Sequence, residues 1–103
     1  MTYQLEITPE AEKDIFAIAA TILQQDSPAA ARRAVSALKQ QLKTLAELPD
    51  SGRAGGCEGT REVVMTGLPY VVIYEIVNDT SVIIVRVLYG ADEPKAVKIE
   101  NQE

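Results

Sequence analysis

The chain contains no histidine, and this absence removes several kinds of catalytic site at once. A chain without histidine has no Ser-His-Asp triad, no Cys-His dyad and no imidazole base that titrates near neutral pH. It has one cysteine, Cys57, so an internal disulfide is excluded and a reducing compartment is expected. Zinc sites are built mainly from cysteine and histidine. We therefore expect no metal ion and no cofactor.

Long apolar runs are also missing, and no segment approaches the length needed to cross a membrane. The first residues, Met1 to Glu6, show neither the basic region nor the apolar core of a signal peptide. These absences predict a cytoplasmic protein without a membrane partner. Apolar residues make up 47% of the 103 residues, which is enough for the core of one domain.

Positive charge is scarce. The net charge is −5, and most of the excess of acidic residues falls after Pro49. Affinity for nucleic acid comes largely from Lys and Arg side chains that neutralise phosphates. An acidic domain is therefore a poor non-specific nucleic-acid binder, and we expect no direct sequence-specific binding of nucleic acid.

The first half of the chain predicts one strand and two helices. Apolar and polar residues alternate from Tyr3 to Thr8, which is typical of a half-buried strand. Thr8-Pro9 and Ser27-Pro28 each combine a capping side chain with a proline at the first helical position. The two helices should form an antiparallel hairpin, the second running from 28 to 48. The core stripe of the first helix is Ala11, Ile15, Ile18 and Ile22, widened by Ala19 and Leu23. The core stripe of the second helix is Val35, Leu38, Leu42 and Leu45.

The second half predicts a glycine-rich loop followed by three strands. Residues 49–60 hold four glycines and are expected to form a mobile loop without a strand. The strands should cover 61–66, 70–77 and 81–88, with tight turns between them. The last strand is apolar on both faces except at Arg86, which favours a central position in the sheet.

The predicted element order is β-α-α-β-β-β. Segregated helices and strands indicate an α+β fold, with a helical hairpin packed on a twisted, mainly antiparallel sheet. We expect a single domain over residues 1–92 and a polar C-terminal tail over 93–103.

Several segments, taken together in this order, resemble the RelE/ParE superfamily of toxins from type II toxin–antitoxin systems. They cover residues 3 to 92. The matching pieces are Thr8-Pro9-Glu10-Ala11, Leu48-Pro49 with Gly52-Arg53, Gly59-Thr60-Arg61-Glu62, Tyr70-Val71-Val72-Ile73-Tyr74, and Ile83-Ile84-Val85-Arg86-Val87-Leu88-Tyr89-Gly90. The resemblance implies the RelE/ParE-like fold and an antitoxin that silences the toxin by wrapping a segment around it.

Two activities are known in this superfamily, and the fold does not separate them. RelE-like members cut mRNA on the ribosome, which requires an acid, a base and cations around the phosphate. ParE-like members poison DNA gyrase and lack the nuclease residues. Positions where RelE-like nucleases carry basic or histidine side chains hold Glu62, Val64, Val71, Tyr89 and Ala91-Asp92-Glu93-Pro94 in this chain. This favours the ParE-like, non-nucleolytic branch.

The candidate site residues have structural alternatives. Arg61, Arg86 and Tyr89 would be the reduced active set of a nuclease, or they would contact a partner. Arg61 could instead bond loop carbonyls or a carboxylate such as Glu75. Arg86 is expected to share a strand face with three apolar residues, Val82, Ile84 and Leu88. Its charge must therefore be paired with a carboxylate or lie at the margin of the sheet.

Other candidates lie elsewhere in the chain. Arg32, Lys39 and Lys43 line one flank of the second helix, where they would meet an acidic antitoxin or gyrase, or simply face solvent. Tyr70 and Tyr74 are stacking or core residues, and Cys57 is an incidental loop thiol.

The sequence therefore predicts a ParE-like toxin that inhibits DNA gyrase by binding, without catalysis of its own, and that a ParD-like antitoxin neutralises in a hetero-oligomer. Two alternatives stay open. One is a RelE-like ribosome-dependent mRNA endonuclease. The other is a degenerate, non-toxic relative that only binds an antitoxin.

Overall fold

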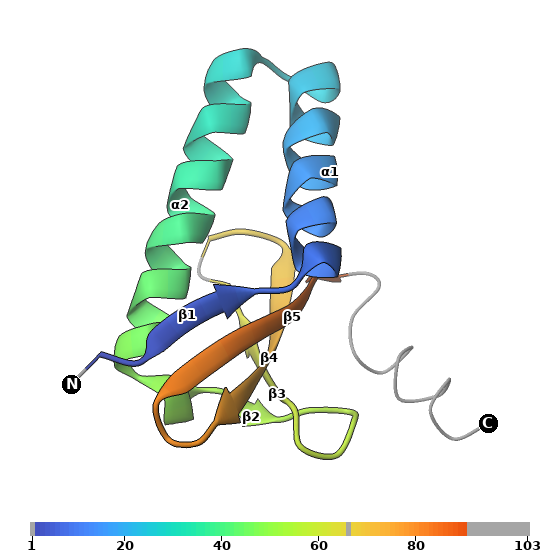
Figure 1. Ribbon diagram of the computed structural model, residues 1–103. Coiled ribbons are helices and arrows are strands. Elements are labelled where there is room, and N and C mark those ends of the chain that lie inside the picture. Colours follow the sequence, from blue (N-terminus) through green and yellow to red (C-terminus); the bar gives the residue numbers. More distant parts are fainter. Residues whose placement is uncertain (1, 66, 91–103) are drawn as a thin grey trace.

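A computed structural model describes residues 2–65 and 67–90 as two helices packed on one face of a five-stranded sheet (Figure 1). The elements, in chain order, are β1 (Gln4–Ile7), α1 (Pro9–Gln25), α2 (Pro28–Glu47), the 3-10 turn η1 (Pro49–Ser51), β2 (Arg53–Ala54), β3 (Arg61–Val64), β4 (Tyr70–Val77) and β5 (Ser81–Tyr89). This confirms the α+β fold that the sequence predicts.

The strand order across the sheet is β1-β5-β4-β3-β2. β1 pairs with β5 in parallel, and the other three pairings are antiparallel. β5 therefore lies between β1 and β4, which confirms its expected place inside the sheet. The helical hairpin connects β1, at one edge of the sheet, to β2 at the opposite edge. The later strands then return toward β1 by antiparallel pairing, and β5 meets β1 in parallel, so the sheet is mixed.

The strand β2 corrects the expectation of an unstructured loop over 49–60. Arg53 pairs with Glu62 and Ala54 pairs with Arg61 in the antiparallel register. The glycines flanking this two-residue strand mask it in the sequence, since strand preference is carried by β-branched and aromatic residues that are absent here. The first of the three expected strands is also shorter than predicted, because β3 ends at Val64.

Each helix begins where its capping residue predicts. The Ala11 amide donates to Thr8 Oγ1 over 3.1 Å, and the Ala30 amide donates to Ser27 Oγ over 3.0 Å. Thr8 makes a second contact that Ser27 lacks: its hydroxyl donates to the Val85 carbonyl oxygen over 2.9 Å. The start of α1 is therefore bonded directly to β5.

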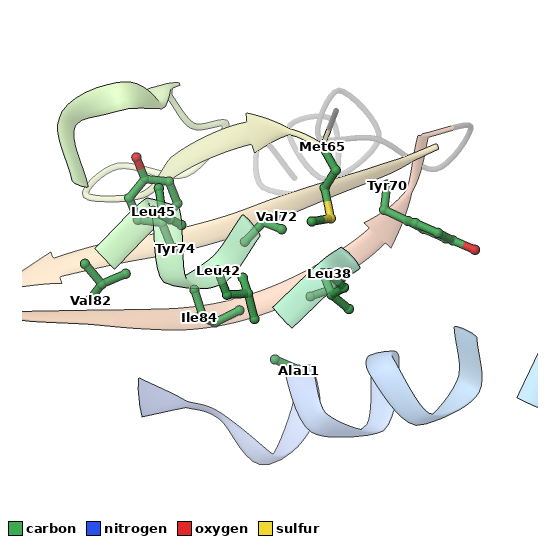
Figure 2. Packing of buried hydrophobic residues seen from close by; sticks show 11 residues of the cluster. Ala11, Leu38, Leu42, Leu45, Met65, Tyr70, Val72, Tyr74, Val82 and Ile84 are labelled. Carbon is green, nitrogen blue, oxygen red and sulfur yellow. The ribbon is translucent and has the colours of Figure 1, made fainter. Parts of the chain in front are cut away.

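The core lies between the hairpin and the sheet. Figure 2 shows side chains of α2 facing those of the central strands, with Ala11 of α1 pointing toward them. The most deeply buried large side chains are Tyr74, Leu38, Leu42, Ile84, Val72 and Val82. The predicted stripe of α2 is confirmed at Leu38, Leu42 and Leu45, all of which belong to this core.

A β-bulge in β5 corrects the expected face of Arg86. Ile73 pairs with Arg86 but the next residue, Tyr74, pairs with Ile84, so Val85 is unpaired. The extra residue inverts the alternation of the strand. Val87 consequently enters the core, and Arg86 lies on the opposite face from Val82 and Ile84.

Two further expectations fall outside the described residues. The boundary between the domain at 1–92 and the tail at 93–103 lies within 91–103, and residue 66 closes the strand expected over 61–66. Within the part of the chain that the structure describes, no helix is long and apolar enough to cross a membrane.

The double role of Thr8 leads to a stability prediction. Thr8→Ala removes both a helix cap and the bond to β5, so we expect it to lower the free energy of unfolding by about 2 kcal/mol. Ser27→Ala removes a cap alone and should cost about 1 kcal/mol. Urea unfolding of both variants beside the wild type measures the difference. Equal losses in the two variants would show that the Thr8–Val85 bond adds nothing.

Candidate functional site

The hydroxyl of Tyr74 fixes the chain where it leaves α2. Tyr74 is fully buried on β4, and its hydroxyl donates to the Pro49 carbonyl oxygen over 2.7 Å. The Gly52 amide donates to the same hydroxyl over 2.9 Å. One phenol thus bonds both sides of the η1 turn and holds it against the sheet.

Gly52 is required by this close approach. A Cβ on residue 52 would collide with the Tyr74 hydroxyl and lie 2.9 Å from the Glu62 carbonyl oxygen. Neither a buried ring nor a strand backbone can move aside cheaply. Pro49 and Gly52, which belong to two pieces of the resemblance, therefore have a structural role.

Arg61 is used by the same turn. Its Nη1 donates to the Gly52 carbonyl oxygen over 3.0 Å, and its Nη2 lies 3.5 Å from Asp50 Oδ1. The expectation of a loop carbonyl as its partner is confirmed. The alternative partner, Glu75, is not the carboxylate it contacts, because Arg61 lies opposite Tyr74 in the register and reaches toward the turn.

Glu62 is the one buried charged residue among those described, with 6% of its surface exposed. Arg53 Nε on the neighbouring strand donates to Glu62 Oε1 over 2.8 Å. The two residues are directly paired across β2 and β3. A basic side chain at position 62 would face Arg53 without a partner. The Arg53–Glu62 pair therefore links β2 to β3. Sequence analysis noted only that position 62 lacks a basic side chain and did not predict this ion pair.

Arg86 is held by Asp14 of α1. Its Nε and Nη2 donate to Asp14 Oδ2 and Oδ1 over 2.6 and 3.0 Å, and the Val87 amide also donates to Asp14 Oδ2 over 3.0 Å. Hydrogen bonding to this carboxylate raises the pKa of Arg86. Asp14 thereby covers the edge of β5 beyond the point where its pairing with β1 ends at Ile84. The structural alternative for Arg86 accounts for both its charge and its position.

Tyr89 is the last residue of β5, three positions after Arg86. Its ring packs edge-on against Tyr70, with centroids 5.9 Å apart, and 51% of Tyr89 is exposed. Arg86, Tyr70 and Tyr89 line one groove of about 420 Å³ between α1 and β5. The groove also includes Thr21, Ile22 and Leu88.

Arg61 does not join this groove. It pairs with Tyr74, whereas Tyr89 pairs with Tyr70, and β4 separates their strands. With about 3.3 Å per residue and 4.8 Å between strands, their backbones lie about 16 Å apart. The three candidate nuclease residues therefore form no single constellation. Among the described residues, no group of three His, Cys, Asp or Glu side chains is placed to hold a metal ion.

The remaining candidates, Arg32, Lys39 and Lys43, are exposed on α2. Arg32 and Lys39 border an open groove of about 510 Å³ between the two helices. The floor of this groove is small and apolar, made of Ala19, Ala31 and Val35, with Ser36 beside it. The structure thus places these cations next to an apolar surface.

Three residues of α1 escape sequence reasoning. Asp14 carries no local sign of its bond to Arg86, which lies 72 positions away. Phe16 and Leu23 are 76% and 50% exposed, although apolar residues at such spacing are expected to be buried. The prediction that Leu23 widens the core stripe is therefore wrong. Phe16 lies outside the stripe formed by Ala11, Ile15, Ile18 and Ile22.

The bonds of Tyr74 generate a prediction of pH dependence. Burial raises the pKa of both Tyr74 and Tyr70 above the usual 10.0. Because the neutral phenol is favoured in the folded state, the stabilisation is complete below about pH 10 and is lost as pH rises through the folded pKa values. Tyr74→Phe should lower the free energy of unfolding at pH 7 by about 1–3 kcal/mol, because two backbone groups lose their partner.

Unfolding measured from pH 7 to 11 separates the two effects. The wild type should lose stability steeply above pH 10, and Tyr74→Phe should lose less over the same interval because it has no phenol to ionise at that site. Tyr70→Phe provides the parallel measurement for the other buried ring. An unchanged slope in both variants would mean that these tyrosines do not govern the alkaline limb.

Comparison with known proteins agrees with this geometry. Residues 5–94 match the family described as ParE toxin of type II toxin-antitoxin system, parDE. A protein of Sinorhizobium fredii, named "Putative toxin Y4kP", is 38% identical over 63 residues. That stretch covers 61% of this chain and 66% of Y4kP, slightly less than two thirds of its length.

Solved structures share the fold at low sequence identity. The chromosomal ParDE system of P. aeruginosa contains a chain with a TM-score of 0.75 and 22% identity, covering 85% of this chain and 96% of its own. A chain of the RelBE2 toxin–antitoxin complex of Mycobacterium tuberculosis has a TM-score of 0.66 and 21% identity, covering 86% and 99%. The family match spans most of the sequence, and this chain therefore belongs to the ParE toxin family of type II toxin–antitoxin systems.

Proposed function

We propose that this chain is a toxin that inhibits DNA gyrase by binding it and that it has no catalysis of its own. Membership of the ParE family supports this target, because the ParE-like branch is the one that the resemblance associates with gyrase. Gyrase would supply all of the DNA chemistry, and the toxin would trap the cleaved intermediate.

The internal hydrogen bonds of Arg61 and Arg86 support the absence of catalysis in this proposal. RNA cleavage by an adjacent 2′-hydroxyl needs cations free to neutralise charge on the phosphate, together with an acid and a base within reach. Arg86 is bonded through two nitrogens to Asp14, and Arg61 is bonded to the turn after α2. With Arg61 on the far side of β4 from Tyr89, the described residues offer a poor nuclease site.

The proposal includes an antitoxin partner in the cytoplasm. The P. aeruginosa and M. tuberculosis neighbours come from a ParDE system and a RelBE2 toxin–antitoxin complex, which supports a small antitoxin for this chain as well. Exposed cations on α2 and the exposed ring of Tyr89 are the contact candidates. Arg61 and Arg86 contribute to such contacts only with the parts of their side chains that their internal bonds leave accessible.

Purified toxin tests the target directly. We expect it to inhibit supercoiling by purified gyrase and to accumulate cleaved DNA, with no codon-dependent cleavage of mRNA on translating ribosomes. Arg86→Ala serves as the discriminating variant in the ribosome assay. Unchanged supercoiling at a large molar excess of toxin would reject the gyrase proposal.

Each alternative has its own outcome in the same experiment. Ribosome-dependent cleavage that disappears in Arg86→Ala would establish a RelE-like nuclease instead. Failure of the chain to arrest growth, when expressed without an antitoxin, would identify a non-toxic relative. A DNA-damage response on expression agrees with gyrase as the target.

A further inference from the structure

The strand β5 is longer than the strand beside it. Its pairing with β1 ends at Ile84, and the Thr8 amide adds one further bond by donating to the Ile84 carbonyl oxygen over 3.0 Å. β5 then continues to Tyr89. Among the described strands, none lies on the β1 side of residues 85–89. The same strand is therefore interior in its first half and forms an edge of the sheet in its second half.

The uncovered stretch has the composition of a strand that pairs readily with other strands. Arg86 is its one charged residue, and the other four are apolar or aromatic: Val85, Val87, Leu88 and Tyr89. An edge of this kind presents N–H and C=O groups to which a strand of another chain can add, and natural proteins block such edges. A charge on the edge is one such block, but the Arg86 guanidinium is bonded to Asp14. A second block is therefore expected on the backbone itself.

Two side chains at the start of α1 take the place of the missing strand. The Val85 carbonyl oxygen accepts from Thr8 Oγ1 over 2.9 Å, and the Val87 amide donates to Asp14 Oδ2 over 3.0 Å. Alternate residues of a strand direct their backbone groups to the same side, so both bonds lie on the edge that a longer β1 would have covered. We name Thr8 and Asp14 the edge clasp.

The backbone of α1 does not seal this edge. A groove of about 420 Å³ separates α1 from the end of β5, and its lining includes Val87 and Tyr89. Ala17 and Thr21, which are small and uncharged, line the side formed by α1. Asp14 lies at the same groove, and its carboxylate holds the Val87 amide. Without that carboxylate, the groove would lead to a free backbone donor on β5.

We propose that the edge clasp keeps the free chain monomeric, because it blocks pairing of the second half of β5 with the same strand of a second copy. Asp14 is the member to test, since Thr8 also caps α1 through the Ala11 amide. The inference does not depend on gyrase as the target. It concerns the chain before any partner binds.

The same stretch of a second copy is a suitable partner for the opened edge. In an antiparallel pair centred on Val87, this residue would face its own equivalent, and Arg86 would lie opposite Leu88 of the second copy. Pairs of β-branched residues stabilise a sheet, and like charges directly opposite each other destabilise it. This register brings the β-branched residues together and keeps the like charges apart. The stretch therefore pairs with itself without repulsion unless the clasp holds its backbone.

Sedimentation of the purified chain over a wide concentration range measures self-association. We expect the wild type to remain monomeric. Asp14→Ala frees the Val87 amide and should raise the self-association constant about tenfold or more. Asp14→Ala combined with Arg86→Ala should associate more strongly still, because the double variant also lacks the cation that opposes edge pairing. Thermal unfolding identifies the variants that are folded.

Two matched variants separate the edge bond from the ion pair. Arg86→Ala removes the guanidinium and leaves Asp14 bonded to the Val87 amide. Asp14→Asn removes the charge and keeps an amide oxygen that can accept from Val87. Both variants should remain monomeric. If either of them associates as strongly as Asp14→Ala, the ion pair matters rather than the edge bond, and the proposal is wrong.

Hydrogen exchange gives a readout that needs no variant. In the wild type, the Val87 amide should exchange as slowly as the amides that bond β4 to β5, although no described strand covers it. It should stay slow in Arg86→Ala and exchange about tenfold faster or more in Asp14→Ala. Fast exchange at Val87 in the wild type overturns the clasp.

Two sedimentation results would also reject the proposal. A wild type that dimerises through β5 would show that the edge is open, and a folded Asp14→Ala that stays monomeric would show that the clasp is not what prevents pairing. None of these measurements involves gyrase or an antitoxin, so their failure leaves the proposed function untouched.

Discussion

The bonds of a single buried phenol determine how the second half of the domain is attached to the first. Tyr74 lies on β4, inside the sheet, and its hydroxyl accepts from Gly52 and donates to Pro49. A buried hydroxyl without partners is costly, so the turn after α2 must stay where these two backbone groups reach it. Arg61 on β3 donates to the Gly52 carbonyl oxygen at the end of that turn. Arg53, the next residue, donates to Glu62 on β3. The short strand β2 begins at the residue that follows Gly52.

The same physical logic separates fold from activity. In this architecture a strand cation can either remain available to a ligand or complete the structure. Arg86 completes it, because Asp14 binds the guanidinium and also accepts from the Val87 amide at an edge that β1 leaves open. Replacing Asp14 would release a cation and an edge amide together. The internal partner of Arg86 therefore limits what this cation can offer a ligand, whatever activities the fold itself permits.

Local signals predicted most of the fold. The helix caps depend on contacts within three residues, at Thr8 and Ser27. The β4–β5 turn depends on two consecutive residues with left-handed backbone, Asn78 and Asp79. Non-local features escaped prediction. The bulge at Val85 depends on its register with β4, and β2 depends on its pairing with β3. The Arg86–Asp14 pair joins residues 72 positions apart, which no periodicity encodes.

The local charge on the helices differs in sign from the net charge of the chain. A net charge of −5 argues against binding to phosphates in general, because like charges repel. Within about a Debye length, however, a partner experiences only the nearby charges. On the hairpin these are Arg32, Arg33, Lys39 and Lys43, next to a helix that is uncharged from 15 to 25. An acidic chain thus presents a cationic surface on α2 beside an uncharged stretch of α1, so the net charge alone does not describe this part of the surface.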